Sequence, residues 1–258
     1  MKIIRLTKSR TNKLIILLLL ALIVQPGLAQ TIDTVKIGSP LQFQFLESGK
    51  SSYIVYFEKE GKVFNISLWE RTLTEKGDLI EITQKWHQND TLMRQIRSLV
   101  KKSDFAPVFH KTSNYQKGTL AFNYKPNAIV SADTVSGNIL KDYRLDWTDN
   151  FFNWELDLEL LSLLPYRNNV TFAIPFNHPG NNTADYFMYK VFDGGRIVLP
   201  GQREIDTWRL HIEWKEGGGG YTDFWISKEH QQVIRSLDVF NGMRRHKIRL
   251  PSNTGQKV

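Results

Sequence analysis

The sequence contains no cysteine among its 258 residues. This absence excludes disulfide bonds and thiolate metal sites, and it excludes attachment to a membrane through a lipidated cysteine. A folded domain of this chain must therefore be held together by its apolar core alone. The length allows this, because a chain of this size buries roughly 70–75% of the surface that it exposes when unfolded.

Common catalytic motifs are absent as well. The chain has no Gly-x-Ser-x-Gly segment, which would form the nucleophile elbow of an α/β hydrolase. The six histidines are far apart, and no pair has the short spacing that presents two imidazoles to one metal ion. Gly49-Lys50-Ser51 ends like a phosphate-binding loop, but Gln44 occupies the position of its first glycine. We therefore expect a non-enzymatic protein without a metal site and without a cofactor.

A large charge excess is also lacking once the N-terminus is set aside. The formal net charge is +8, but five of the positive charges lie within the first 13 residues, which leaves +3 for the rest. Nucleic-acid binding needs many basic side chains against the phosphates, so this small charge argues against a nucleic-acid partner. The basic segment around Arg244, Arg245 and Arg249 is more typical of a solvated strand face.

The N-terminus has the three parts of a secretory signal peptide. A basic stretch is followed by an apolar run from Leu14 to Val24 and by small residues up to Ala29. The apolar run is shorter than the roughly 20 residues that a helix needs to cross a bilayer. We predict that the signal peptide, residues 1–29, is cleaved after Ala29, and that residues 30–258 form one domain in the periplasm or outside the cell.

The rest of the chain is dominated by alternation of apolar and polar residues, which is typical of β-strands. In the clearest case, Thr207 to Trp214, alternate residues share one apolar face: Trp208, Leu210, Ile212 and Trp214. Glu60-Gly61-Lys62 and Lys76-Gly77-Asp78 are typical hairpin turns between such strands. These features predict a mainly β protein, in which a large antiparallel meander curls into an open half-barrel.

One segment departs from this alternation. Residues of about 150–164 are rich in leucine and glutamate, follow the capping residue Asp149 and end before Pro165, which predicts a helix. Apolar residues cover most of its circumference, so we expect the helix to pack on the concave side of the sheet. Only a narrow stripe through Glu155, Glu159 and Ser162 is polar, and we expect this stripe to be solvated.

The seven tryptophans leave two interpretations of the interior open. Aromatic side chains either fill the core or line an apolar cavity between the helix and the sheet. For the second interpretation we predict six ligand-binding residues from the helix and the sheet: Phe151, Trp154, Leu158, Leu161, Trp208 and Trp214. A separate hypothesis is a secreted hydrolase that uses Asp146 with Glu155 or Glu159, because glycosidases need two carboxylates.

The second half of the chain resembles an exported bacterial family of unknown function. The resemblance is carried by Asp223-Phe224-Trp225-Ile226-Ser227-Lys228, by Val233-Ile234-Arg235-Ser236, and by Leu163-Leu164-Pro165-Tyr166 before Phe172-Ala173-Ile174. In the first half, only the meander character is similar. Members of that family resemble the LolA and LolB lipoprotein carriers in fold, with a LolA/LolB-like (YmcC-like) unclosed half-barrel that has helical material across its concave side.

The resemblance implies a periplasmic or peripherally envelope-associated protein that holds a lipid or another hydrophobic small molecule. It supplies no catalytic residues, and the absent cysteine argues against anchoring of the LolB kind. The leading hypothesis is therefore a non-enzymatic, exported binding protein with a role in envelope maintenance. The first alternative is a structural or protein-interaction module whose core is filled by its own side chains.

Overall fold

The computed structural model describes residues 31–146, 151–199, 204–214 and 219–251. The predicted signal peptide and its cleavage site lie outside the described residues. None of the helices within these ranges is long and apolar enough to cross a membrane.

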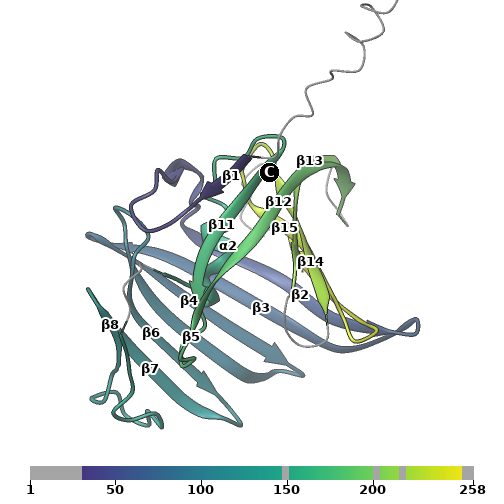
Figure 1. Cartoon of the computed structure of the whole chain (residues 1–258). Helices are drawn as coiled ribbons and strands as arrows, with labels where there is room; N and C mark the ends of the chain where they lie inside the picture. Colours follow the sequence, from purple (N-terminus) through teal and green to yellow (C-terminus); the bar gives the residue numbers. More distant parts are fainter. Residues whose placement is uncertain (1–30, 147–150, 200–203, 215–218, 252–258) are drawn as a thin grey trace, which may run out of the picture.

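The described strands belong to one large sheet (Figure 1). The strands of the first half are β1 (Thr31–Thr34), β2 (Gly49–Lys59), β3 (Lys62–Lys76), β4 (Leu79–Gln88), β5 (Thr91–Lys101), β6 (Pro107–Asn114), β7 (Gly118–Lys125), β8 (Ala128–Ser131) and β9 (Arg144–Asp146). Those of the second half are β10 (Phe152–Asn153), β11 (Val170–Asn177), β12 (Ala184–Val198), β13 (Glu204–Glu213), β14 (Gly220–Ser227), β15 (Val233–Phe240) and β16 (Met243–Arg249). The helical segments are η1 (Phe43–Phe45), η2 (Trp154–Leu156) and α2 (Asp157–Leu161).

Two meanders make up the sheet. Strands β2 to β9 follow one another in space, as do β11 to β16, and antiparallel pairing of β16 with β2 joins the two sets. Strands β1 and β10 pair with β11 in parallel. The edge strands β1 and β9 are not paired with each other in the described ranges, so the sheet curls without closing. The predicted mainly β, unclosed antiparallel sheet is confirmed, although its strand order combines two meanders.

Residues with positive φ form a tight turn, and a glycine forms a bulge. Between β2 and β3, Glu60 and Gly61 have φ angles of 51° and 74°, as a two-residue hairpin turn of the primed type requires. Within β12, Gly194 is the extra residue of a bulge, and a Cβ atom there would lie 2.4 Å from Thr207 Oγ1. The predicted hairpin at Glu60-Gly61-Lys62 is thus confirmed, and the bulge explains the glycine in β12.

The helix is shorter than predicted. Segments η2 and α2 together cover 154–161 instead of 150–164, because Phe152 and Asn153 pair with β11 as the short strand β10. The side chain of Asn153 accepts a hydrogen bond from the Glu155 N–H at 3.0 Å and caps the first turn. The predicted cap, Asp149, lies outside the described residues. Because of this pairing with β11, the helix begins at Trp154 instead of at about residue 150.

The helix and the sheet share one apolar core. Leu156, Leu160 and Leu161 are at most 1% exposed and belong to the same cluster as Phe172 of β11 and Leu210 of β13. Figure 1 shows α2 on the inner side of the curled sheet. The predicted packing of a buried helix against the concave face is confirmed.

The acidic stripe of the helix faces the sheet, so the prediction of a solvated stripe is wrong. Glu159 forms a bidentate ion pair with Arg71 of β3, and Glu155 accepts a hydrogen bond from Arg94 of β5 at 2.6 Å. Ser162 is buried, and its hydroxyl donates to the Leu158 carbonyl. Buried carboxylates are tolerated here because the sheet supplies cationic partners for them.

Candidate ligand-binding site

A hollow lined by aromatic side chains lies between η2 and strands β11, β12 and β13. We call it the aromatic pocket, and its apolar wall consists of Trp154, Phe176, Phe187, Met188, Ile212 and Trp214. Its volume is about 280 Å³. Two-residue alternation aims Ile212 and Trp214 at the same face of the sheet. The amphipathic pattern recognised in the sequence of β13 therefore contributes directly to this wall.

Ring contacts hold Trp154 in this wall. Its ring centroid lies 4.4 Å from that of Phe187, 4.6 Å from that of His178 and 5.2 Å from that of Phe176. Aromatic pairs at these distances stabilise defined ring orientations. The polar part of the lining includes His178, Asp185 and Glu213, and the lining contains no lysine or arginine. The aromatic pocket thus combines a large apolar wall with an acidic rim.

A chain of hydrogen bonds positions Trp214. Its indole Nε1 donates to Thr222 Oγ1 at 3.1 Å, and the Thr222 hydroxyl donates to Asp238 Oδ1 at 2.7 Å. The other oxygen of this buried carboxylate, Oδ2, accepts from Arg245 Nε at 2.5 Å. The chain crosses β14 and β15 and ends at β16. This chain of hydrogen bonds connects the aromatic pocket to a second pocket, which is lined by Arg245.

The second hollow, the Arg245 pocket, lies between strands β2 to β5 and β16. Its lining includes Val55, Phe57, Ser67, Trp86, Met93 and Arg245, and its volume is about 250 Å³. No aspartate or glutamate contributes to this lining. The Trp86 ring stacks on Trp69, with 4.5 Å between ring centroids, and this contact fixes its position.

One row of cross-strand neighbours connects the two pockets. The pairs are Ile212 with Thr222, Thr222 with Asp238, Asp238 with Arg245, and Arg245 with Phe57. Directly opposed residues of paired strands point to the same face of a sheet. The aromatic pocket and the Arg245 pocket therefore lie on one face, at the two ends of this row.

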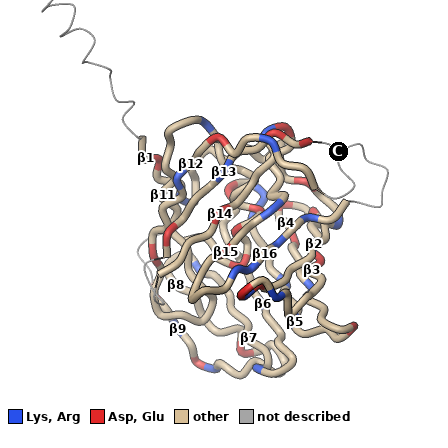
Figure 2. Tube along the Cα trace, turned by 90° about the vertical axis from the view of Figure 1, so that its right-hand side faces the viewer, with Lys and Arg blue, Asp and Glu red and all other residues tan. Residues whose placement is uncertain are grey.

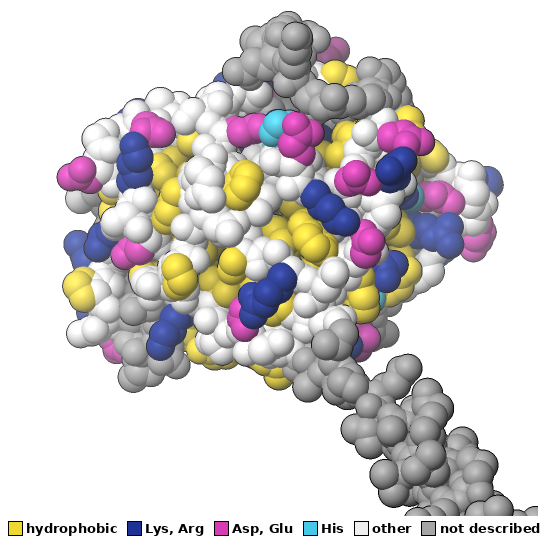
Figure 3. Space-filling view, turned by 90° about the horizontal axis from the view of Figure 1, so that it is seen from above, with side chains coloured by type: hydrophobic (Ala, Val, Ile, Leu, Met, Phe, Trp, Pro, Cys, Tyr) yellow, Lys and Arg dark blue, Asp and Glu magenta, His cyan; other side chains and the backbone are white. Residues whose placement is uncertain are grey.

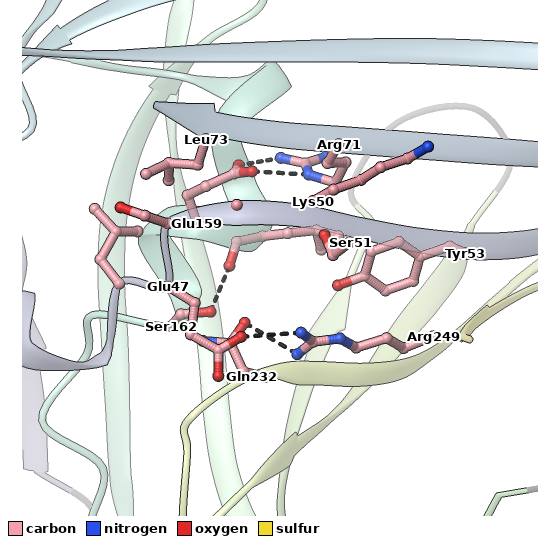
Figure 4. Close-up of a pocket in the computed structure, with 14 residues that line it drawn as sticks. Glu47, Lys50, Ser51, Tyr53, Arg71, Leu73, Glu159, Ser162, Gln232 and Arg249 are labelled. Atoms are coloured by element: carbon pink, nitrogen blue, oxygen red, sulfur yellow. Dashed lines mark hydrogen bonds and ion pairs between the residues drawn. The ribbon is translucent and has the colours of Figure 1, made fainter. Parts of the chain in front are cut away.

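A third pocket is small and ionic (Figure 4). This Glu159 pocket has a volume of about 50 Å³, and the ion pair of Glu159 with Arg71 forms part of its lining. Across the pocket, Arg249 donates to Glu47 at 2.9 Å and to Gln232 at 3.2 Å. The space suits a few water molecules and is too small for an organic ligand. The ion pair in its lining holds the helix to the sheet.

Burial governs the protonation of the polar groups beneath the helix. It lowers the pKa of Lys247 to about 8, although Asp157 opposes this shift. It also raises the pKa of Asp157, against the effect of Lys247. Burial lowers the pKa of His110 to about 4, and the ring Nδ1 lies 3.0 Å from Asn153 Nδ2. The imidazole of His110 is therefore uncharged at neutral pH and helps to hold the residue that caps the helix.

The carboxylates considered for hydrolysis are held by arginines. Asp146 is exposed on β9 and lies 2.5 Å from Arg144 Nη2. Burial would raise the pKa of Glu155, but Arg94 and His110 outweigh it and lower this pKa. A glycosidase acid needs a raised pKa, so the environment of Glu155 is that of a structural ion pair.

Two of the six predicted ligand-binding residues, Trp154 and Trp214, are brought together in the aromatic pocket. Leu158 and Leu161 are only 3% and 0% exposed and belong to the core cluster. Leu158 also borders the Glu159 pocket. The helix therefore contributes one aromatic side chain to the pocket and uses its leucines for packing.

The remaining two predicted residues lie elsewhere. Trp208 stacks on Tyr166 with 6.2 Å between centroids, and Lys228 Nζ lies 4.6 Å from its ring centroid. Phe151 is partly exposed and directly precedes β10. Neither residue lines any of the three pockets described above.

Four residues that line the two larger pockets are not among the predicted ligand-binding residues: Phe187, Met188, Trp86 and Arg245. Alternation in β12 could have placed Phe187 on the apolar face. Arg245 carried no such signal, because the basic C-terminal segment is also typical of a solvated strand. Its place in a pocket follows from the pairing of β16 with β2, which joins residues that are distant in sequence.

Charges of both signs alternate over the molecule. Lysine and arginine lie among aspartate and glutamate along the described part of the trace in Figure 2. On the face shown in Figure 3, hydrophobic side chains form small patches between charged ones. This mixed distribution agrees with the small net charge of the chain after its first 29 residues.

The sequence matches the model of a family described as Protein of unknown function (DUF3108) over residues 52–249. Among solved structures, the chain is similar to a beta-barrel-like protein of domain of unknown function DUF1849 from Brucella abortus. The two chains share 8% sequence identity with a TM-score of 0.45, and the similarity covers 79% of this chain and 97% of that one. No curated protein matches the sequence. The family match includes every residue that lines the aromatic pocket and the Arg245 pocket.

Proposed function

The chain belongs to the DUF3108 family of proteins of unknown function, and we propose that it is a non-enzymatic binding protein for a hydrophobic ligand. The observation that carries this proposal is the aromatic pocket, a hollow of about 280 Å³ with six large apolar side chains in its wall. Protein interiors are packed with few voids larger than a water molecule. Concave, mostly apolar hollows are the usual sites for small hydrophobic ligands.

The expected driving force is the burial of apolar ligand surface. Each Å² removed from water contributes about 25 cal/mol, and the indole rings of Trp154 and Trp214 offer large contact areas. The aromatic pocket alone is close to the lower end of the ~300–1,000 Å³ range of ligand sites. The Arg245 pocket is a separate hollow of about 250 Å³ on the same face of the sheet.

Export to the periplasm, or secretion, is part of the same proposal. It is supported by the basic stretch, the apolar run from Leu14 to Val24 and the small residues up to Ala29. A role in holding lipids for envelope maintenance is supported by the open, curled sheet with a helix on its inner side, which is the arrangement expected of a LolA-like carrier. Detection of the mature N-terminus at Gln30 in an envelope extract would test the export directly.

A neutral fluorescent probe, N-phenyl-1-naphthylamine, tests the proposed binding. We expect the purified protein to bind it and Trp214→Ala to weaken binding about tenfold, because the variant removes a large part of the apolar wall. The matched control is Trp225→Ala, since Trp225 lies on an adjacent strand against Arg235 and does not line the aromatic pocket. This control should bind the probe like the unmodified protein.

Two results would overturn the proposal. One is the absence of probe binding together with organic extracts of the protein that contain no lipid by mass spectrometry. The other is undiminished probe binding by Trp214→Ala, which would show that the aromatic pocket is not the binding site. The first result favours the interaction module with a filled core, and pull-down from envelope extracts would then be the next experiment.

A further inference from the structure

The two pockets differ in the charge of their linings. The aromatic pocket includes Asp185 and Glu213 and no basic side chain, whereas the Arg245 pocket includes an arginine and no acidic side chain. An anionic group would therefore be repelled from the first pocket but not from the second, where it meets the N–H donors of Arg245. A ligand that occupies both has only one favourable orientation for a negative head group.

The guanidinium of Arg245 retains binding capacity. Its Nε donates to Asp238, while neither Nη atom has a hydrogen-bond partner among the residues that the structure describes. The side chain is 36% exposed, so a ligand can reach it. The two Nη atoms present parallel N–H groups in the fork geometry that matches a carboxylate or a phosphate.

Trp86 lines the same pocket and has a donor without a partner among the described residues. Its Nε1 is buried and has no hydrogen-bond partner in the described part of the chain. The stacking of Trp86 on Trp69 prevents the ring from turning easily toward another acceptor. A buried N–H without a partner is unfavourable, and a ligand oxygen in the Arg245 pocket would relieve this.

The distance between the pockets suits an elongated ligand. Ile212 of the aromatic pocket and Arg245 are three strands apart along one row, which corresponds to about 14 Å at the normal strand spacing. A fatty acyl chain of ordinary length covers this distance. Val55, Phe57 and Met93 also give the Arg245 pocket an apolar wall beside its donors.

We infer that the ligand is an anionic amphiphile whose carboxylate or phosphate binds at Arg245 and Trp86 while its hydrocarbon chain occupies the aromatic pocket. This inference rests on the proposed function and adds the class and the orientation of the ligand. The acidic rim of the aromatic pocket sets this orientation, because it disfavours the opposite placement of the head group.

The experiment compares cis-parinaric acid with its methyl ester, which has the same chain without the charge. We expect the acid to bind at least tenfold more tightly than the ester. Arg245→Gln should remove this difference, so that the acid and the ester bind with equal affinity. Arg244→Gln is the matched control, because Arg244 is exposed and pairs with Glu58 at 3.5 Å outside the pocket. Dodecyl phosphate should displace the acid. Inorganic phosphate should not, because it lacks the hydrocarbon chain that binds to the aromatic pocket.

Trp86→Phe keeps the inference testable if Arg245→Gln fails to fold, since it removes the indole N–H and preserves an aromatic ring, with some loss of apolar surface. It should weaken binding of the acid severalfold more than binding of the ester. Equal binding of acid and ester by the unmodified protein would overturn the inference while the proposed function stands. Displacement by inorganic phosphate alone would overturn the amphiphile and indicate a free anion. Failure of both probes to bind would overturn the proposed function itself.

Discussion

Replacing Glu159 by glutamine tests whether the ionic layer beneath the helix is desolvated. The side chains of Glu159 and Arg71 are only 10% and 4% exposed. Arg71 Nε donates to Glu159 Oε1 at 2.8 Å, and its Nη1 has no hydrogen-bond partner in the described ranges. The Glu159→Gln variant therefore leaves a buried guanidinium that has lost its bidentate countercharge.

The expected cost follows from this geometry. Removing one partner of a buried ion pair destabilises a protein by about 3–5 kcal/mol. Glutamine has nearly the same volume and keeps one acceptor, so no cavity forms and we expect the lower end, about 3 kcal/mol. The charge of Arg71 already contributes to the lowered pKa of the buried Lys247, so loss of the carboxylate also leaves these two cations less compensated.

Urea denaturation followed by tryptophan fluorescence measures the effect. With a slope of about 3 kcal/mol per M, the midpoint should shift down by about 1 M. Glu204→Gln is the matched control, because Glu204 and its partner Arg196 are 61% and 68% exposed. An exposed pair contributes little to stability because solvent screens it, so this control should leave the midpoint nearly unchanged.

A double variant separates the charge from the packing. Replacing both Arg71 and Glu159 by methionine removes the whole pair, and such replacements are often neutral or stabilising. We therefore expect the double variant to recover most of the stability that Glu159→Gln loses. If Glu159→Gln shifts the midpoint no more than Glu204→Gln, the pair is hydrated and the reasoning is refuted.

Three further predictions concern stability. Lowering the pH from 6.5 to 4 should reduce the free energy of unfolding by about 3 kcal/mol, because in this range His110 binds a proton in the unfolded chain but not in the folded one. A His110→Gln variant with an unchanged pH slope would contradict this. Gly194→Ala should lower the urea midpoint more than Gly195→Ala, because the first clashes with the neighbouring strand, whereas the second places alanine at a positive φ of 64° in open space; equal midpoints would contradict the bulge geometry. Tyr53→Phe should cost about 1 kcal/mol in urea unfolding, because it leaves the Val233 carbonyl without the phenolic donor at 3.0 Å, whereas an unchanged midpoint would show that water replaces it.

Features set by neighbouring residues were predictable from the sequence. The turn at Glu60 and Gly61 and the alternation in β13 depend on local conformational preferences, and both are confirmed. The helix was predicted too long because Phe152 and Asn153 find a strand partner in β11, which is outside the reach of local patterns.

The candidate site was predictable only in part. Residue type identified Trp154 and Trp214, because aromatic side chains near a curved sheet either fill or line its interior. The inward direction of Glu155 and Glu159 was not predictable, since their arginine partners belong to strands that precede the helix by many residues. The position of Arg245 depends on strand order in the same way.

The pairing of β16 with β2 also has a consequence for how the chain folds. His246 contacts Glu58, 188 positions earlier, so the β2 edge of the first meander is covered only after β16 has been made. Contacts across such long loops slow folding, and an uncovered strand edge invites association with other chains. Truncation before Met243 would therefore expose two strand edges at once, and the last strand decides whether the newly made chain folds or aggregates.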